Sequence, residues 1–138
     1  MLSEDKIREL TVQLKPFFNA IEPIQIVYLF GSALQEYSFH DLDVAVLCHE
    51  KFTKSKEAFF KVLRWGAELE SYLKPRIPVD LRLLNEAPVH FQHEVIRSGV
   101  IIFERNRDLR VIFEASVLTE YLDYEPTRRF FNEHLFDL

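Results

Sequence analysis

The chain has 138 residues, 48% of them hydrophobic, and a formal net charge of −5 at pH 7. This length and composition fit one domain with a substantial core, so we treat residues 1–138 as a single domain. The acidic balance argues against direct nucleic-acid binding, because domains that bind by bulk electrostatics are usually basic. No apolar run approaches the roughly 20 residues of a membrane-spanning helix, so no membrane contact is expected.

The cysteine content and the first residues both favour a cytoplasmic location. The single cysteine, Cys48, cannot form an internal disulfide, which fits a reducing environment. The N-terminus is polar and acidic, unlike a signal peptide. We therefore expect a soluble cytoplasmic protein.

The first predicted element is a helix. Ser3 can cap it, and apolar residues recur at three- and four-residue steps through Ile21. Pro16 should kink or divide this helix, and Pro23 should end it. A strand buried on both faces follows over 24–30, because that run is short, apolar and rich in β-branched residues.

Gly31 ends this strand and leads into a turn over 32–40, with one helical turn at 33–36. The chain has only three glycines, so we expect this one to answer a backbone need, either a positive φ or the close approach of a ligand. A second strand is predicted over 41–47. Its alternation places Leu42, Val44 and Val46 on one face and Asp41, Asp43 and Ala45 on the other.

Five further elements alternate between helix and strand. They are a helix over 55–73, a strand over 79–84, a helix over 88–98 ended by Gly99, a strand over 100–103 and a long helix from Leu109 that Pro126 interrupts. The helix over 55–73 carries an apolar stripe that includes Phe59 and Leu63. This order predicts an α/β (α+β) fold, a mixed β-sheet of about four strands with helices packed against it.

Three aspartates, Asp41, Asp43 and Asp80, lie at or inside apolar strands. Each could lie on a solvated strand face, with Asp80 paired to Arg82. Like charges at alternate strand positions are unfavourable without a cation or a donor between them. Three carboxylates on neighbouring strands provide the oxygen ligands that Mg²⁺ prefers, and a pair of such ions can support phosphoryl displacement.

Gly31 and Ser32 add a possible phosphate site. A glycine lets the backbone approach a phosphate, and exposed N–H groups with a hydroxyl can hold anionic oxygens. A Gly-Ser dipeptide alone carries no information, so its meaning depends on the aspartates that follow it.

The combination of these motifs carries a family resemblance. Leu29–Ser32, then Asp41–Leu47 and later Val79–Leu81, resemble the nucleotidyltransferase superfamily typified by DNA polymerase beta, and more closely the minimal nucleotidyltransferases of prokaryotes. The similarity continues to residues 121–126 and so covers most of the chain. It implies the nucleotidyltransferase fold.

The resemblance also implies roles for the site residues. Asp41, Asp43 and Asp80 would ligate Mg²⁺, as two ions, and Asp80 would help to deprotonate the attacking hydroxyl. Gly31 and Ser32 would hold the triphosphate of ATP. The reaction would be an in-line attack of an acceptor hydroxyl on the α-phosphorus, with pyrophosphate leaving.

The turn between the two motifs departs from the family pattern. Residues 33–40 are fewer than usual and include no Lys, Arg or Gly. A cation that the family often places there for the triphosphate is therefore missing. Arg82 and Lys61 are candidates to supply it from elsewhere.

Minimal nucleotidyltransferases resembling this chain are commonly antitoxins whose partner is an all-helical HEPN-domain toxin, an RNase. The resemblance implies transfer of AMP from ATP to a hydroxyl of that toxin, expected to be a tyrosine. Two alternatives remain, a small-molecule enzyme of the aminoglycoside type and an antitoxin that acts by binding alone. The aromatic-rich C-terminal helices could form the contact surface of a homo- or hetero-oligomer, or could pack in the core.

Other reactive side chains are expected to be structural. His90 and His93 have a spacing that can bind a metal, but no third ligand is evident nearby. Cys48 has no basic neighbour except His49 and should be an inert thiol.

Overall fold

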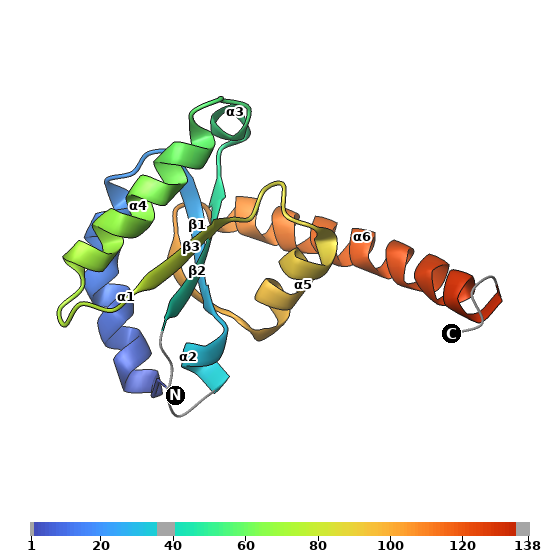
Figure 1. The fold of residues 1–138 in the computed structure, drawn as a ribbon, viewed down its shortest axis with the longest axis horizontal. Coiled ribbons are helices and arrows are strands. Elements are labelled where there is room, and N and C mark those ends of the chain that lie inside the picture. The colour runs from blue at the N-terminus through green and yellow to red at the C-terminus, as the bar shows by residue number, and fades with distance from the viewer. Residues whose placement is uncertain (1, 36–40, 135–138) are drawn as a thin grey trace.

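The computed structural model describes residues 2–35 and 41–134. A four-stranded sheet lies at the centre, and helices cover both of its faces (Figure 1). The strands are β1 (Ile24–Phe30), β2 (Leu42–Cys48), β3 (Val79–Leu83) and β4 (Val100–Glu104). The helices are α1 (Glu4–Asn19), α2 (Ser32–Gln35), α3 (Glu50–Thr53), α4 (Ala58–Tyr72), α5 (Val89–Ser98) and α6 (Arg107–His134).

The sheet is mixed, as the sequence predicts. Its strand order is β3-β2-β1-β4. β1 pairs antiparallel with β2 and β4, while β2 and β3 are parallel. The short connection after β1 permits only antiparallel pairing, whereas α3 and α4 provide the crossover that a parallel pair needs. As a result, the end of β1 and the beginnings of β2 and β3 lie at the same end of the sheet.

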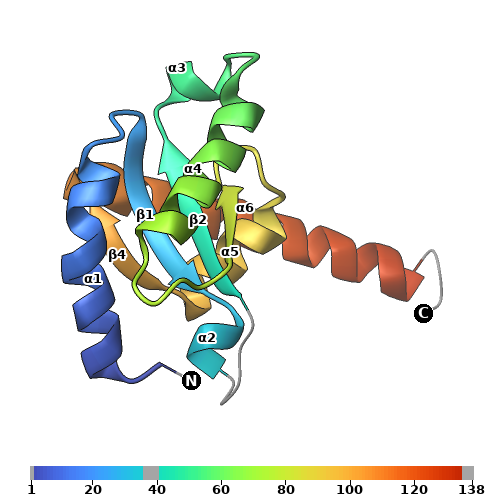
Figure 2. The same ribbon diagram turned by 60° about the vertical axis from the view of Figure 1, so that its left-hand side comes forward.

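Two hydrophobic clusters lie on opposite faces of the sheet. Leu42, Val44 and Val46 of β2 belong to the cluster beneath α1 and α4. Ala45 and Leu47 belong to the cluster beneath α5 and α6. This alternation confirms the two faces expected for the second strand, and Figure 2 shows β1 and β2 between the two helical layers. Asp43 therefore lies on the face that α5 and α6 cover only in part.

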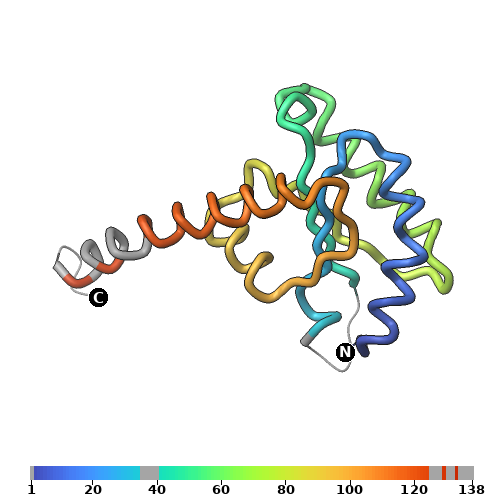
Figure 3. Tube along the Cα trace, turned by 180° about the vertical axis from the view of Figure 1, so that it is seen from behind, coloured from blue at the N-terminus to red at the C-terminus, as the bar shows by residue number. Residues whose placement is uncertain are grey.

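Two prolines that were expected to interrupt helices lie inside them. Pro16 lies within α1, which is continuous over Glu4–Asn19. Val12, whose carbonyl loses its bond to Pro16, is exposed, so water can replace that bond. α6 likewise continues past Pro126 to His134 and projects from the body of the molecule (Figure 3), where solvent can reach the freed carbonyl. Pro23 does not end α1, which stops at Asn19.

The surface of α4 also differs from the prediction. Phe59 and Leu63, expected in its apolar stripe, are 67% and 57% exposed. Trp65 is buried instead and stacks on Phe52 of α3, a short helix that was not predicted from the sequence. The stripe is therefore rotated by part of a turn, because α3 supplies an aromatic partner that the periodicity could not reveal.

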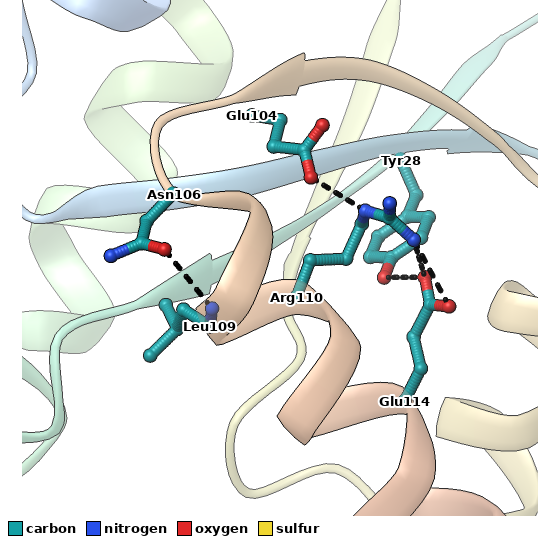
Figure 4. Close-up of polar contacts among 6 residues, drawn as sticks. All are labelled: Tyr28, Glu104, Asn106, Leu109, Arg110 and Glu114. Carbon is teal, nitrogen blue, oxygen red and sulfur yellow. Dashed lines mark hydrogen bonds and ion pairs between the residues drawn. The ribbon is translucent and has the colours of Figure 1, made fainter.

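A chain of polar contacts ties α6 to the central strand (Figure 4). The hydroxyl of Tyr28 in β1 donates to the carboxylate of Glu114 at 2.8 Å. Arg110 bonds to Glu114 and to Glu104 at the end of β4, with 2.6 Å between Arg110 Nε and Glu104 Oε1. Burial and the neighbouring Glu114 carboxylate raise the pKa of Tyr28, so it remains a neutral donor. Because Tyr28 is buried and Arg110 and Glu114 are partly buried, these three groups depend on one another for their hydrogen bonds.

The described helices differ from what a membrane-spanning helix requires. Within residues 2–35 and 41–134, none combines the length and the apolar character that crossing a bilayer requires.

We predict that Glu114→Ala destabilises the protein by about 1–3 kcal/mol, because the buried Tyr28 hydroxyl loses its acceptor and Arg110 loses an ion-pair partner. Urea denaturation followed by circular dichroism measures the change. The matched control is Glu120→Ala, at an exposed position of the same helix, which should change the free energy of unfolding by less than about 0.5 kcal/mol. An equal effect of both substitutions would contradict this role of the network.

Candidate active site

The aspartates meet where β1 ends and where β2 and β3 begin. Asp43 and Asp80 are directly paired in the parallel register of β2 and β3. Asp41 precedes β2 and is exposed. Because it lies two residues before Asp43, it shares that residue's side of the sheet. The structure thus brings Asp80 together with Asp41 and Asp43, which lie almost 40 residues before it in the sequence, at one end of the sheet.

Gly31 lies directly against Asp43. Its φ is +80°, a conformation that favours glycine. A Cβ at Gly31 would collide with the Asp43 carboxylate. The expected close approach is therefore made by a carboxylate of the chain itself. Ser32, the first residue of α2, donates a backbone hydrogen bond to the same carboxylate, so the Gly-Ser motif and the second aspartate form one unit.

Asp43 is the carboxylate whose ionisation the site perturbs. Its pKa is raised, first by burial and then by the negative charge of Asp80, with a smaller contribution from Asp41. The hydrogen bond from Ser32 and the charge of Arg82 act in the opposite direction. The charged form of Asp43 is therefore disfavoured in the folded chain, and a bound cation would relieve this cost.

Asp80 pairs with Arg82, the alternative that the sequence left open. Arg82 Nε and Nη2 lie 3.2 Å and 3.0 Å from the same oxygen, Asp80 Oδ2. The Arg82 guanidinium also lies over the ring of Phe91 in α5, at 5.5 Å from its centroid. Sequence reasoning missed Phe91, because an apolar residue on the inner side of a short helix is normally assigned to the core.

The carboxylates have suitable chemistry for Mg²⁺ but are not closed around an ion. Their oxygens are the ligands that a hard cation takes, and the raised pKa of Asp43 shows that their charges act on one another. Among the residues that the structure describes, however, no three acidic, histidine or cysteine side chains are arranged to hold a metal ion. Asp80 is instead paired with Arg82.

Lys61, the other candidate to supply positive charge, lies on the opposite side of the sheet. It belongs to α4, which packs on the face of Leu42, Val44 and Val46. Its Nζ is 3.8 Å from Glu57 and lies over the ring of Phe52. The sheet separates Lys61 from the aspartates. Most of the turn over 33–40, which lacks a basic residue, lies outside the described part of the chain, at residues 36–40.

The remaining candidates have structural surroundings. The ring of His93 stacks on Tyr121 of α6 at 3.7 Å, and His90 makes edge contacts with Tyr121 and Tyr124. These contacts join α5 to α6. Cys48 is buried, and burial raises its pKa to about 12, so its thiol stays protonated at neutral pH.

Comparison with known proteins identifies the class. A family model described as Polymerase beta, nucleotidyltransferase matches residues 12–108. This match covers more than half of the chain, including β1, β2, β3 and the three aspartates. The protein belongs to the polymerase beta nucleotidyltransferase family, which confirms the family resemblance and the nucleotidyltransferase fold predicted from sequence.

Solved structures show the same fold over almost the whole chain. A toxin–antitoxin structure with AMP-PNP is 24% identical, with a TM-score of 0.66 over 98% of this chain and 99% of that chain. A structure of a tri-AMPylated Shewanella oneidensis HEPN toxin in complex with MNT antitoxin is 21% identical, with a TM-score of 0.66, covering 97% of this chain and 99% of that chain. A toxin–antitoxin structure described as MntA–HepT is 19% identical, with the same TM-score and coverage. A search of curated proteins gave no significant match.

We predict that Gly31→Ala destabilises the protein by more than about 2 kcal/mol, because a side chain is strained at this φ and its Cβ meets the Asp43 carboxylate. Combining it with Asp43→Ala should recover part of the loss and leave the backbone strain. Chemical denaturation of the two single variants and the double variant measures this coupling. Strictly additive effects would show that the carboxylate does not constrain Gly31.

We also predict that Asp43→Asn stabilises the metal-free protein at pH 7. A raised folded-state pKa means that the native state binds more protons than the unfolded state between the unfolded and folded pKa values. Stability therefore falls as pH rises through that window. The gain in the free energy of unfolding from Asp43→Asn should be complete at pH values above this window, and it should vanish below the unfolded-state pKa of 3.8. Thermal unfolding across pH in the presence of EDTA tests this, and a destabilised Asp43→Asn at pH 7 would contradict it.

Proposed function

We propose that this protein is a Mg²⁺-dependent nucleotidyltransferase that transfers AMP from ATP to a hydroxyl of a helical HEPN-domain toxin, and so acts as its antitoxin. The observation that carries this proposal is the in-register pairing of Asp43 with Asp80 beside Gly31 and Ser32. Carboxylates for a divalent cation and a backbone suited to phosphate lie at one end of the sheet. We place the reaction in the cytoplasm, which fits the single, buried cysteine.

Asp41, Asp43 and Asp80 would hold the metal, as two ions. Bound Mg²⁺ neutralises charge on the phosphates and on the attacking and leaving oxygens. The chain supplies the rest of the chemistry by positioning. Asp80, on edge strand β3, is 41% exposed and is therefore accessible to an acceptor hydroxyl, from which it can accept the proton.

Gly31 and Ser32 would bind the triphosphate of ATP. Gly31 has no side chain that would keep a phosphate from the main chain, and Ser32 offers a hydroxyl at the start of α2. Arg82 is the candidate for the positive charge that the turn over 33–40 lacks, because it lies on the carboxylate face of β3. A planar guanidinium is well suited to phosphate oxygens.

The toxin as acceptor is supported by the fold. The similar structures described above are toxin–antitoxin complexes, one with AMP-PNP and one with a tri-AMPylated toxin. Each is matched over 97–98% of this chain. We propose a tyrosine hydroxyl as the acceptor and a hetero-oligomer with the toxin as the functional assembly. Apolar side chains on projecting α6, among them Leu118 and Leu122, are exposed and available for contact.

One observation favours a second function, an antitoxin that acts by binding alone. In the structure Arg82 pairs with Asp80, and no three metal-ligating side chains are arranged around an ion in the described part of the chain. A chain that kept this arrangement permanently would bind the toxin without modifying it.

The decisive experiment incubates the purified protein with Mg²⁺, α-labelled ATP and a helical HEPN-domain protein. We expect label on the partner, none with EDTA, and at least a 100-fold slower transfer with Asp41→Asn plus Asp43→Asn, since losing a catalytic charge interaction costs about that much. Asp5→Asn plus Glu9→Gln is the matched control, because it removes two exposed negative charges from α1, a helix to which the proposal gives no role, and should leave transfer unchanged.

Three results would redirect the proposal. Absence of label on any partner overturns the transferase function. Label on an aminoglycoside instead of the protein assigns a small-molecule enzyme. If Asp41→Asn plus Asp43→Asn protects cells from the toxin as well as the wild-type protein does, the antitoxin acts by binding alone.

A further inference from the structure

Arg82 lies where a cation would be expected. Its guanidinium makes two bonds to a single oxygen of Asp80, at 3.2 Å and 3.0 Å. The two residues alternate along β3, so both side chains lie on the face that carries Asp43. The positive charge thus neutralises the carboxylate that is paired in register with Asp43.

A second contact keeps Arg82 on this face. The guanidinium lies over the ring of Phe91, at 5.5 Å from the centroid. Phe91 in turn makes an edge contact with Phe30, the last residue of β1, at 5.5 Å between centroids. Phe30 pairs with Asp43. A guanidinium released from Asp80 would therefore remain beside the site, supported by the aromatic ring.

The pairing is weak enough to be exchanged. Arg82 and Asp80 side chains are 55% and 41% exposed, and exposed ion pairs change an equilibrium by at most about fivefold. A divalent cation shared by three carboxylates has a much larger electrostatic attraction for them than one half-exposed guanidinium.

We propose that Arg82 is an internal placeholder for the metal. Its guanidinium forms an ion pair with Asp80 until a divalent cation binds, and it then binds the nucleotide phosphates. This inference rests on the proposed function, since it assigns Arg82 a role at the same site. Arg82 is a positioning residue for Asp80 in the metal-free protein and a phosphate-binding residue afterwards. Metal binding and nucleotide binding are thereby coupled through one side chain.

The first test is calorimetric titration with Mg²⁺ alone. Arg82→Gln should bind Mg²⁺ about two- to fivefold more tightly than the wild-type protein, because the competing ion pair is gone. Arg97→Gln is the matched control: it removes the same charge from an exposed ion pair with Glu94 on α5 and should leave the affinity unchanged. An affinity of Arg82→Gln that is equal to or weaker than wild type overturns the inference.

A double-mutant cycle separates competition from simple charge repulsion. If Arg82 acts through Asp80, Arg82→Gln should have no effect on Mg²⁺ affinity when Asp80→Asn is already present. Repulsion through space would persist in that background. A full effect of Arg82→Gln there overturns the placeholder role.

The guanidinium itself provides a readout that is independent of binding energies. In NMR spectra the Arg82 Nε–Hε signal, identified by its loss in Arg82→Lys, should shift as Mg²⁺ is added. If the backbone amides of Asp43 and Asp80 shift while this signal stays fixed, the metal binds without releasing Arg82, which overturns the inference.

For nucleotide binding, the expected effect of Arg82→Gln on affinity is the opposite of its effect on Mg²⁺ binding. With saturating Mg²⁺, Arg82→Gln should bind AMP-PNP about tenfold more weakly, since a charge-assisted bond to phosphate is lost. Unchanged AMP-PNP affinity overturns the phosphate role. Failure of the proposed function gives a different result. If neither the wild-type protein nor the Arg82→Gln variant binds Mg²⁺ or AMP-PNP, the proposed function and this inference are both overturned. If both proteins bind Mg²⁺ and AMP-PNP equally well, only this inference is overturned.

Discussion

The concentration of negative charge at one end of the sheet is the constraint on which the rest of the site depends. Register places Asp43 opposite Asp80, and the approach of the Asp43 carboxylate leaves room only for a glycine at position 31. The main-chain N–H of Ser32 and the guanidinium of Arg82 each offset part of that charge. Backbone conformation, hydrogen bonding and the ion pair on β3 are therefore responses to the same electrostatic problem.

The frame that holds these charges together lies elsewhere in the molecule. β1 and β2 are buried along almost their whole length, with helices on both sides. The Tyr28, Glu114 and Arg110 contacts attach α6 to the central strand without using any residue of the site. A protein that keeps unfavourable charge for function needs such stability at a distance, because native stability is a small difference between large terms.

Sequence reasoning could predict the strands, the mixed sheet and the residues that meet at its end, because alternation and short connections are local signals. It expected Gly31 to answer either a positive φ or the close approach of a ligand; the positive φ is confirmed, and the group that lies close to Gly31 in the structure is the Asp43 carboxylate. Tertiary context decided the rest. Pro16 and Pro126 are tolerated because solvent can form hydrogen bonds with the carbonyls that they leave unpaired. Trp65 is buried against Phe52, whereas Phe59 is exposed. The ion pair between Asp80 and Arg82 depends on how the side chains are placed, which the periodicity of the sequence does not encode.

The buried thiol has a practical consequence. Cys48 is the single cysteine of the chain, and with a pKa of about 12 it offers almost no thiolate to alkylating reagents near neutral pH. A cysteine introduced at an exposed position, such as Leu118→Cys on α6, would then be the one thiol that reacts quickly. Fluorophores or spin labels can thus be attached to the projecting helix without first removing the native cysteine from the core.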